Sequence, residues 1–345
     1  MPTYLYCDYE IIILLLALMV AFTFISCDEP EALHVHKFST EWKTDDTYHW
    51  HECTVDGCTE IKDKAEHSVE KAWIYDEKAS TPTEIKLIRK CSICSKELKV
   101  QTLTEGFKLV ANAEALESAV LEDNCKIILT ADISLNDYLE LAKDVEIYGN
   151  GHKLTIRCKE PDYGASGLYI KAPQKVVIRD LTIEAGSNYS VQTALIYKHY
   201  CDADVEIENV ILNCNPNSTF ENPAIGIQNT YDKKGKFTVK NCTITNAKYG
   251  MYFNALSDSV IDGNTIEGTL YNGIAIAGDN VDYPCKNVTI SNNILKNVAS
   301  KNYDAIMYNC GIYIGENTDN IITDGNDITL SEKSTNGKEI YRAEK

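Results

Sequence analysis

Histidine and cysteine are concentrated in one short part of this chain of 345 residues. Five of the seven histidines lie between His34 and His67. The same region carries two close cysteine pairs, Cys53/Cys58 and Cys91/Cys94. Thiolate and imidazole groups are ligands of tetrahedral zinc, and a Cys-x2-Cys knuckle presents two thiolates at a suitable spacing. These residues therefore predict a small module that binds zinc.

The expected zinc ion has four protein ligands, His36, Cys53, Cys58 and His67, with His51 as a substitute. Cys91 and Cys94 would form half of a second site, whose other ligands the sequence does not name. Two short-range disulfides, or free thiols, are the alternatives. Residues 28–104 contain few apolar side chains, so this module needs a metal or a disulfide in order to fold.

The module repeats itself weakly. His36 precedes Trp42 by six residues, and His67 precedes Trp73 by the same number. A close cysteine pair follows each tryptophan. The pattern H-x-F…W…YHWHEC…C…AEHS resembles small modules that are repeated in surface proteins of anaerobic bacteria. This resemblance implies a spacer or interaction module and no catalytic role.

Residues 105–345 repeat two short apolar motifs in alternation. The first motif reads IRDLTI, IENVIL, VKNCTI, IDGNTI, ISNNIL and TDGNDI, beginning at residues 178, 207, 239, 261, 290 and 323. The second reads GLYI, ALIY, AIGI, GMYF, GIAI and GIYI. Successive copies lie 22 to 33 residues apart, which is typical of a solenoid. Alternating apolar residues without intervening helices predict an all-β, right-handed parallel β-helix.

The polar residues inside these motifs are explained by the fold itself. One column should form the corners, because Asp, Asn and Gly tolerate a left-handed backbone. Its members are Asp180, Asn209, Asn241, Gly263, Asn292 and Gly325. The next column points inward and carries Asn264, Asn293 and Asn326, which should stack as an amide ladder. A third column alternates in charge through Arg179, Glu208, Lys240 and Asp262.

The start of this region carries the family signal. Asn112-AEALESAVLEDN predicts an amphipathic capping helix over 112–124, and LVANAEALESAVLEDNCKIILTADISL…VEIYGNGHKLTI follows the pattern of the first rungs. Together with the repeats, this stretch resembles the right-handed parallel β-helix superfamily of pectate lyases. More narrowly, it is similar to the pectate-lyase-like adhesive domains of bacterial surface lipoproteins. The resemblance implies a shared fold and leaves function to be argued from the site.

Enzymes of this superfamily use clustered carboxylates or carboxylate-bound calcium with a basic residue. Asp202, Asp204 and Glu206 could hold Ca²⁺, although a solvated loop is the alternative. The repeat region has only three arginines, Arg157, Arg179 and Arg342, and lacks the Asn-Thr-Asp, Asp-Asp and Arg-Ile-Lys motifs of the glycosidases. We therefore predict no catalytic residue. A calcium-dependent polysaccharide lyase or a glycosidase is the alternative function.

The sequence also predicts a surface that could bind a ligand. Tyr169, Tyr252 and Tyr313 share the outward position of the second motif, with Ile196, Gly226 and Ala275 between them. Exposed tyrosines stack on sugar rings or anchor a protein partner, although they could equally be plain strand formers. We expect non-enzymatic adhesion to glycan or extracellular protein. A structural stalk is a second alternative.

The first residues predict export. Ile11–Ser26 is a 16-residue uncharged run that suits a signal peptide, and Phe24-Ile25-Ser26-Cys27 resembles a relaxed lipobox. We therefore divide the chain into a leader (1–26) with lipidation at Cys27, the His/Cys module (28–104) and the β-helix (105–345). An uncleaved anchor helix is the alternative. The net charge of -18 argues against nucleic acid as a partner, and we expect a lipid-anchored, surface-exposed protein of the bacterial envelope.

Overall fold

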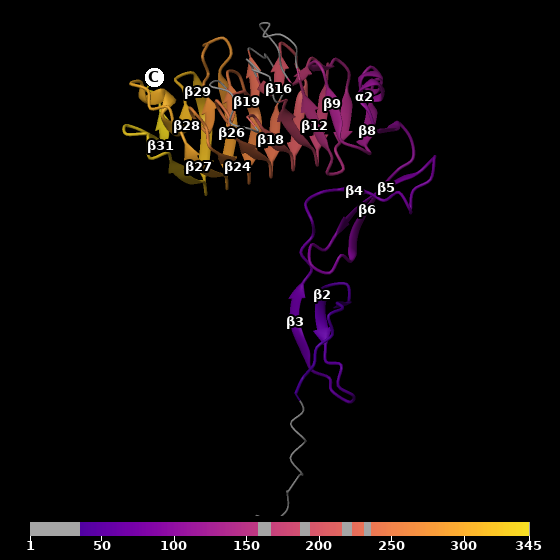
Figure 1. Cartoon of the computed structure of the whole chain (residues 1–345). Coiled ribbons are helices and arrows are strands. Elements are labelled where there is room, and N and C mark those ends of the chain that lie inside the picture. The colour runs from indigo at the N-terminus through magenta and orange to yellow at the C-terminus, as the bar shows by residue number, and fades with distance from the viewer. Residues whose placement is uncertain (1–34, 158–166, 187–193, 216–222, 231–235, 345) are drawn as a thin grey trace, which may run out of the picture. The chain divides into compact units, whose positions relative to one another are not determined.

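The computed structural model describes residues 35–157, 167–186, 194–215, 223–230 and 236–344 (Figure 1). The chain divides into two compact units, which we call the smaller and the larger unit. The smaller comprises Met1–Ser68 and Ser92–Lys96, and the larger comprises Val69–Cys91 and Glu97–Lys345. The predicted leader and Cys27 lie outside the described residues. No helix among the described residues is long and apolar enough to cross a membrane.

The smaller unit is one antiparallel sheet with almost no core. Its strands β1 (Lys43–Thr44), β2 (Tyr48–Glu52) and β3 (Ile61–Glu66) lie in the order β1-β2-β3. All six residues of β3 are exposed. Among the described residues of this unit, only His49 is buried. Because apolar burial is the main stabilising contribution in most domains, this sheet needs another source of stability.

The larger unit is a parallel solenoid of three sheets (Figure 1). The first sheet contains β7 (Phe107–Val110), β8 (Cys125–Leu129), β11 (Val145–Tyr148), β14 (Lys175–Arg179), β17 (Asp204–Glu208), β20 (Phe237–Lys240), β23 (Ser257–Asp262), β26 (Cys285–Ser291) and β29 (Thr318–Asp324). The second contains β9 (Ile133–Leu135), β12 (Lys153–Ile156), β15 (Thr182–Ala185), β18 (Ile211–Asn213), β21 (Thr243–Thr245), β24 (Thr265–Glu267), β27 (Ile294–Val298) and β30 (Asp327–Leu330). The third contains β10 (Leu139–Leu141), β13 (Leu168–Ile170), β16 (Ala194–His199), β19 (Ile225–Thr230), β22 (Met251–Phe253), β25 (Ile274–Ile276), β28 (Cys310–Ile314) and β31 (Lys338–Arg342).

Each turn of the chain adds one strand to each sheet, from β8-β9-β10 to β29-β30-β31. Equivalent apolar residues therefore stack in register, as in Ile147, Ile178, Ile207, Val239, Ile261 and Ile290. These side chains belong to one continuous core. Single cysteines behave as small core residues, and Cys125, Cys214, Cys242, Cys285 and Cys310 are all buried. The predicted parallel β-helix is confirmed.

The polar columns have the structural roles that the sequence predicts. All six corner residues have left-handed φ angles between 52° and 64°. In the ladder, the Asn264 side-chain amide donates to the Asn293 side-chain oxygen at 2.8 Å, and Asn293 donates to Asn326 at 2.9 Å. The charge column is also in register, with Arg179 paired to Glu208 at 3.4 Å. These residues build the fold and are not evidence of a site.

The N-terminal end of the solenoid is covered as predicted. Helix α2 (Ala113–Ala119) places Leu116 and Ala119 in the core, at the magenta end of the stack in Figure 1. The Asn112 side chain caps it by accepting from the N–H of Ala115 at 2.9 Å. The helix is shorter than the expected range of 112–124. It ends early because the chain turns toward β8, with Asn124 at a left-handed φ of 57°.

A second small sheet is part of the larger unit. It consists of β4 (Ile74–Tyr75), β5 (Ile85–Lys90) and β6 (Glu97–Leu103), in antiparallel order β4-β5-β6. Its apolar residues Ile85, Leu87 and Leu103 pack with Ile128 and Tyr148 on the outside of the first sheet. The remaining element of the larger unit is the short 3-10 helix η1 (Ile306–Tyr308), which precedes β28.

Corner side chains of the solenoid hold the segment that leads into β4. The N–H of Trp73 donates to the Asp180 carboxylate at 3.0 Å, and the N–H of Tyr75 donates to Asn150 at 2.6 Å. The Lys71 ammonium donates to Asn241 at 3.0 Å. Burial raises the pKa of Asp180, although hydrogen bonds from Asn209 and Trp73 oppose this shift. Residues 71–75 are therefore fixed to the β-helix by their backbone as well as by side chains.

Candidate metal centre and binding surface

The structure forms two groups of metal-ligating side chains. His36, Cys53 and Cys58 form the three-ligand group, and His49, His67, Cys91 and Cys94 form the four-ligand group. Within each group the ligand atoms lie within 4.8 Å of one another. A His2Cys2 cluster of this kind could hold a metal ion such as zinc. Cys53 and Cys58 are free thiols in the structure.

Two ligand atoms of the four-ligand group lie at a spacing that suits tetrahedral zinc. The Cys94 sulfur lies 3.5 Å from Nδ1 of His67. Zinc bonds of about 2.3 Å to sulfur and 2.0–2.1 Å to nitrogen would place these two atoms about 3.6 Å apart at a tetrahedral angle. His49 and Cys91 are fully buried.

The backbone selects the tautomer of His67. Nε2 of His67 lies 2.9 Å from the carbonyl oxygen of Asp45, so this nitrogen carries the proton and donates it. Nδ1 is then left with a lone pair, which faces Cys94. Such a hydrogen bond orients a metal-binding imidazole and raises its basicity. The N–H of His67 also donates to the carbonyl of Thr47 at 2.9 Å, which fixes the start of the ligand segment.

The three-ligand group is assembled by a turn and a strand pair. Phe38 and Cys53 form an antiparallel bridge, which brings His36 beside the end of β2. The N–H of Cys58 donates to the carbonyl of Val55 at 3.0 Å, so this turn returns the second thiol toward the first. The Cys58 sulfur lies 3.3 Å from Nδ1 of His36.

The two thiols of this group differ in acidity. Desolvation opposes ionisation of Cys53, but hydrogen bonds from the Val55 N–H and from His36 outweigh it and lower its pKa to about 6. The Glu60 N–H favours ionisation of Cys58, but desolvation and the neighbouring Cys53 raise its pKa. One thiolate is therefore available at neutral pH, and a bound cation would ionise the second.

The structure distributes the predicted zinc ligands differently from the sequence analysis. His36, Cys53 and Cys58 come together, whereas His67 lies in the other group with both Cys91 and Cys94. His51 belongs to neither group among the described residues, and its ring lies 3.8 Å from that of Trp42. His49 was not predicted. The weak repeat of the His/Cys module indicates this arrangement, because each half of the module carries its own histidine followed by two cysteines.

The proposed calcium ligands are engaged with cations of the protein. Glu206 pairs with Lys175 at 2.9 Å and with Arg179 at 3.1 Å. Asp204 pairs with Lys236 at 3.6 Å, and Asp202 is exposed ahead of β17. These carboxylates are not among the groups of described residues that could hold a metal. The calcium site stays a prediction.

Glu206→Gln tests whether this carboxylate has a structural role. Burial opposes ionisation of Glu206, but its pairs with Lys175 and Arg179 outweigh this and lower its pKa. A lowered carboxyl pKa stabilises the fold above the unfolded pKa, and this stability is lost as pH falls through the folded pKa. We expect the free energy of unfolding of the variant to be about 1 kcal/mol lower than that of the wild type at pH 7. This difference should become smaller as the pH falls through the folded pKa of Glu206.

Urea unfolding of both proteins across this pH range measures the effect, with Asp202→Asn as the control at an exposed carboxylate. If Ca²⁺ instead raises the melting temperature of the wild type but not of Glu206→Gln, the carboxylate binds calcium and the structural role is contradicted.

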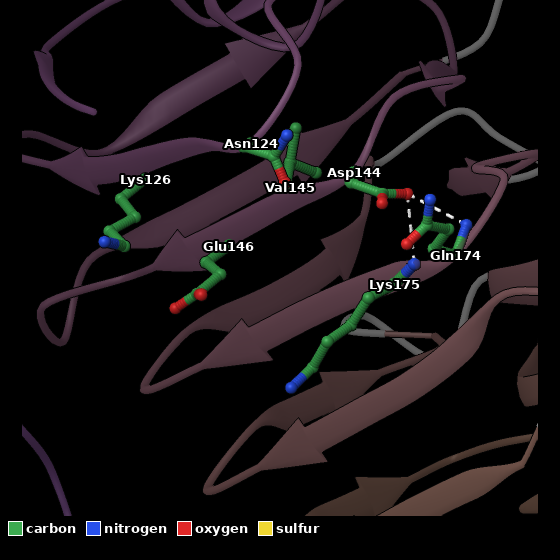
Figure 2. Close-up of a pocket in the computed structure, with 7 residues that line it drawn as sticks. All are labelled: Asn124, Lys126, Asp144, Val145, Glu146, Gln174 and Lys175. Carbon is green, nitrogen blue, oxygen red and sulfur yellow. Dashed lines mark hydrogen bonds between the residues drawn. The ribbon is translucent and has the colours of Figure 1, made fainter.

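A polar groove on the first sheet collects acidic and basic side chains (Figure 2). Its lining residues are Asn124, Lys126, Asp144, Val145, Glu146, Gln174 and Lys175. The Asp144 carboxylate accepts from the N–H groups of Gln174 and Lys175, both at 3.0 Å. Glu146 accepts from the Tyr148 hydroxyl at 2.8 Å. The carboxylates of this groove are thus already used within the fold. Arg157 directly follows β12 of the second sheet and is not among the residues that line the groove.

Tyrosines gather on the outer side of the third sheet. One outward column runs through Glu140, Tyr169, Tyr197, Gln228, Tyr252, Ala275, Tyr313 and Tyr341. Further tyrosines contact its rings, and we call the whole set the tyrosine face: Tyr138, Tyr169, Tyr197, Tyr200, Tyr249, Tyr252, Tyr271, Tyr303, Tyr308, Tyr313 and Tyr341. His199 joins this set through Tyr169, Tyr197 and Tyr200. The centroids of neighbouring rings on this face lie 4.2–6.2 Å apart.

The register of this column corrects the sequence analysis at two rungs. Tyr197 and Gln228 occupy the outward position that was assigned to Ile196 and Gly226. Ile196 instead pairs with Leu168 and points into the core. The reason is that the first five residues of β16 are all buried, so the alternation that reveals register is lost there.

The three predicted tyrosines differ in exposure. Tyr169 and Tyr252 are half-buried, but Tyr313 is only 8 % exposed because Ile306, Met307 and Tyr341 pack around it. The expectation of an exposed ring at Tyr313 is therefore wrong. Their role in ligand binding stays a prediction. The more exposed rings of the face, Tyr138, Tyr200 and Tyr303, lie outside the repeat motifs, so the repeat does not reveal them.

One carboxylate lies against the tyrosine face. The Tyr252 hydroxyl donates to the Asp279 carboxylate at 3.0 Å. Desolvation raises the pKa of Asp279, although this hydrogen bond opposes the shift. Burial and the charge of Asp279 raise the pKa of Tyr252, which keeps its hydroxyl protonated. The face thus offers aromatic rings together with an exposed hydrogen-bond acceptor.

The larger unit contains a right-handed parallel β-helix, and the small His/Cys sheet precedes it in the sequence. The family model "Right handed beta helix region" matches residues 166–342, more than half of the chain, and the chain belongs to this family. A second model, "Putative pectate lyase-like adhesive domain", matches residues 108–220. Comparison with curated proteins and with solved structures gave no match.

Proposed function

We propose that this chain is an exported, lipid-anchored adhesin of the bacterial surface, which binds glycan through the tyrosine face. The match to an adhesive domain supports adhesion. The tyrosine face is the observation that carries the proposal, because eleven of the 21 tyrosines of the chain gather on one side of one sheet. An extracellular protein is the alternative ligand.

The chemistry of the face suits a sugar chain. Rings of half-exposed tyrosines supply flat apolar area for the C–H faces of pyranose rings, and their hydroxyls supply hydrogen bonds. Asp279 could accept hydrogen bonds from sugar hydroxyls. Lys171 lies 4.6 Å from the ring centroid of Tyr169 and adds a donor. A solenoid repeats such contacts along its axis, so an extended ligand can bind several rungs at once.

The proposal also includes a lipid anchor at the N-terminus and a zinc ion in the smaller unit. Ile11–Ser26 followed by Cys27 supports export and lipidation, and incorporation of labelled palmitate into wild type and Cys27→Ser tests this part. The four-ligand group would hold zinc and stabilise the smaller unit. This unit would then serve as a folded spacer between the anchor and the β-helix. Removal of the metal with a chelator tests whether zinc stabilises the smaller unit.

Tyr252→Ala is expected to weaken glycan binding at least tenfold. The change removes one ring of the face and releases Asp279 from its hydrogen bond, while the half-buried position spares the core. A glycan array with the purified protein identifies the ligand, and calorimetry then gives the two dissociation constants. Tyr169→Ala, at another rung of the tyrosine face, should have a similar effect.

Ile294→Ala is the matched control, because Ile294 is an exposed apolar residue of the second sheet. Its affinity should equal that of the wild type. Unchanged affinity in both tyrosine variants would contradict binding through this face. Blank glycan and matrix-protein arrays would leave the structural stalk as the function.

A polysaccharide lyase or glycosidase is the remaining alternative. Such an enzyme would act at the polar groove, where Lys126, Glu146 and Lys175 lie on successive strands β8, β11 and β14 (Figure 2). Release of unsaturated uronate or of reducing ends from a polysaccharide panel tests it. Activity lost in Glu146→Gln would favour the enzyme over the adhesin.

A further inference from the structure

We propose that His36, Cys53 and Cys58 form a second metal centre, a zinc site with three protein ligands and an open fourth position for an external imidazole, carboxylate or thiolate. The sequence alone predicts a site that combines these residues with His67. The structure assigns His67 to the other group, so the three-ligand group has to be considered separately. This inference goes beyond the proposed adhesion and does not depend on it.

The geometry of the three ligands suits zinc. The Cys58 sulfur and Nδ1 of His36 lie 3.3 Å apart, close to the distance of about 3.6 Å that tetrahedral zinc imposes on sulfur and nitrogen ligands. The Cys53 sulfur lies within 4.8 Å of both. Two thiolates and one imidazole are soft to borderline donors, which favour zinc over calcium or magnesium.

The smaller unit preorganises this group through its own backbone. The N–H of Thr54 donates to the carbonyl of Lys37 at 2.6 Å, and the N–H of Cys53 donates to the carbonyl of Glu60 at 3.0 Å. Gly57 has a left-handed φ of 76°, which allows the turn between the two cysteines. All three ligands therefore come from segments of the smaller unit that are joined by backbone hydrogen bonds.

The surroundings of this group differ from those of the four-ligand group. His36 is exposed, and Cys53 and Cys58 are half-buried, so a bound ion would face solvent. In the four-ligand group, His49 and Cys91 are fully buried. Zinc sites with four protein ligands are closed, whereas sites with three keep a position for water or another ligand. Among the described residues, one module thus combines a closed group with an open one.

Metal content tests the number of centres. The purified full-length protein, kept reduced and free of chelator, should contain two zinc ions per chain by elemental analysis. Cys53→Ser and the double variant Cys91→Ser/Cys94→Ser should each contain one, because each leaves only two ligands in a different group. Far-UV circular dichroism checks that the β-helix is intact in both variants.

Cobalt substitution tests the open position. Added imidazole should change the visible absorption of Co²⁺ in the wild type and in the double variant Cys91→Ser/Cys94→Ser, which retains the three-ligand group. It should leave the spectrum of Cys53→Ser unchanged, because that variant retains only the closed site.

Three results would overturn the proposal. One zinc or less per wild-type chain would exclude a second centre. Two zinc ions in Cys53→Ser would assign the metal to other residues. A wild-type cobalt spectrum that does not respond to imidazole would show a closed site, as would follow if a residue outside the described range, such as His34, supplied the fourth ligand. The adhesion assay is unaffected by any of these results.

Discussion

Asn293→Ala is expected to lower the free energy of unfolding by about 3–5 kcal/mol. Asn293 is fully buried in the ladder, where its side-chain oxygen accepts from both the backbone N–H and the side-chain amide of Asn264 at 3.0 and 2.8 Å. Its own amide donates to the carbonyl of Ile261 at 3.0 Å. Alanine leaves the Asn264 N–H buried without its partner, at about 1–3 kcal/mol, removes the side-chain bonds to Asn264 and to the Ile261 carbonyl, at about 1 kcal/mol each, and adds a small cavity.

Equilibrium unfolding in urea measures this loss, and Asn287→Gly is the control. Asn287 also links rungs, accepting from Asn320 and donating to Asp258, but these bonds are exposed to water. Glycine adopts the left-handed φ of 54° found at this position, so the control should lose no more than about 1 kcal/mol. Equal losses in the two variants would contradict the burial argument.

Chelation of zinc is expected to unfold the smaller unit while the β-helix stays folded. No apolar residue is buried among the described residues of this unit, so the metal would supply most of its stability. Small zinc domains gain on the order of 10 kcal/mol from the ion and lose their fold without it. The β-helix has its own continuous core and should not respond.

Tryptophan fluorescence reports on this transition, because Trp42 and Trp50 lie in the smaller unit and only Trp73 lies in the larger. Limited proteolysis should cut the chelated protein before residue 69 and spare the β-helix. Cys201→Ala, in the β-helix, should respond to chelator as the wild type does. If reductant alone unfolds the unit and chelator has no effect, the cysteines form disulfides and the zinc proposal fails.

The solenoid could be predicted from sequence because its rules are local. A corner needs a left-handed residue, and only Asn, Asp and Gly supply one readily, so Asp180 and Asn209 mark the turns. A strand between corners must alternate, so Ile178 and Ile207 mark the inward side. The spacing of these residues along the chain then predicts where each turn of the solenoid begins and ends. The capping helix followed in the same way from Asn112.

The third sheet was harder to predict at two rungs for a physical reason. A one-residue slip in register moves every side chain to the opposite face, and only alternation reveals the slip. In β16 the residues from Ala194 to Lys198 are all buried, which removes the alternation. The exposure of Tyr313 also escaped prediction, because the residues that pack around it, such as Ile306 and Tyr341, come from outside its own repeat.

The sequence by itself determined the β-helix, its corners, the Asn264–Asn293–Asn326 ladder and the presence of a His/Cys module. Each of these follows from residues that are neighbours in the chain or repeat at a fixed interval. Only the tertiary structure decided which histidine joins which cysteine pair and which tyrosines remain exposed. Those properties depend on distances between segments far apart in the chain, such as the 27 residues that separate His67 from Cys94. Spacing in the sequence does not fix such distances.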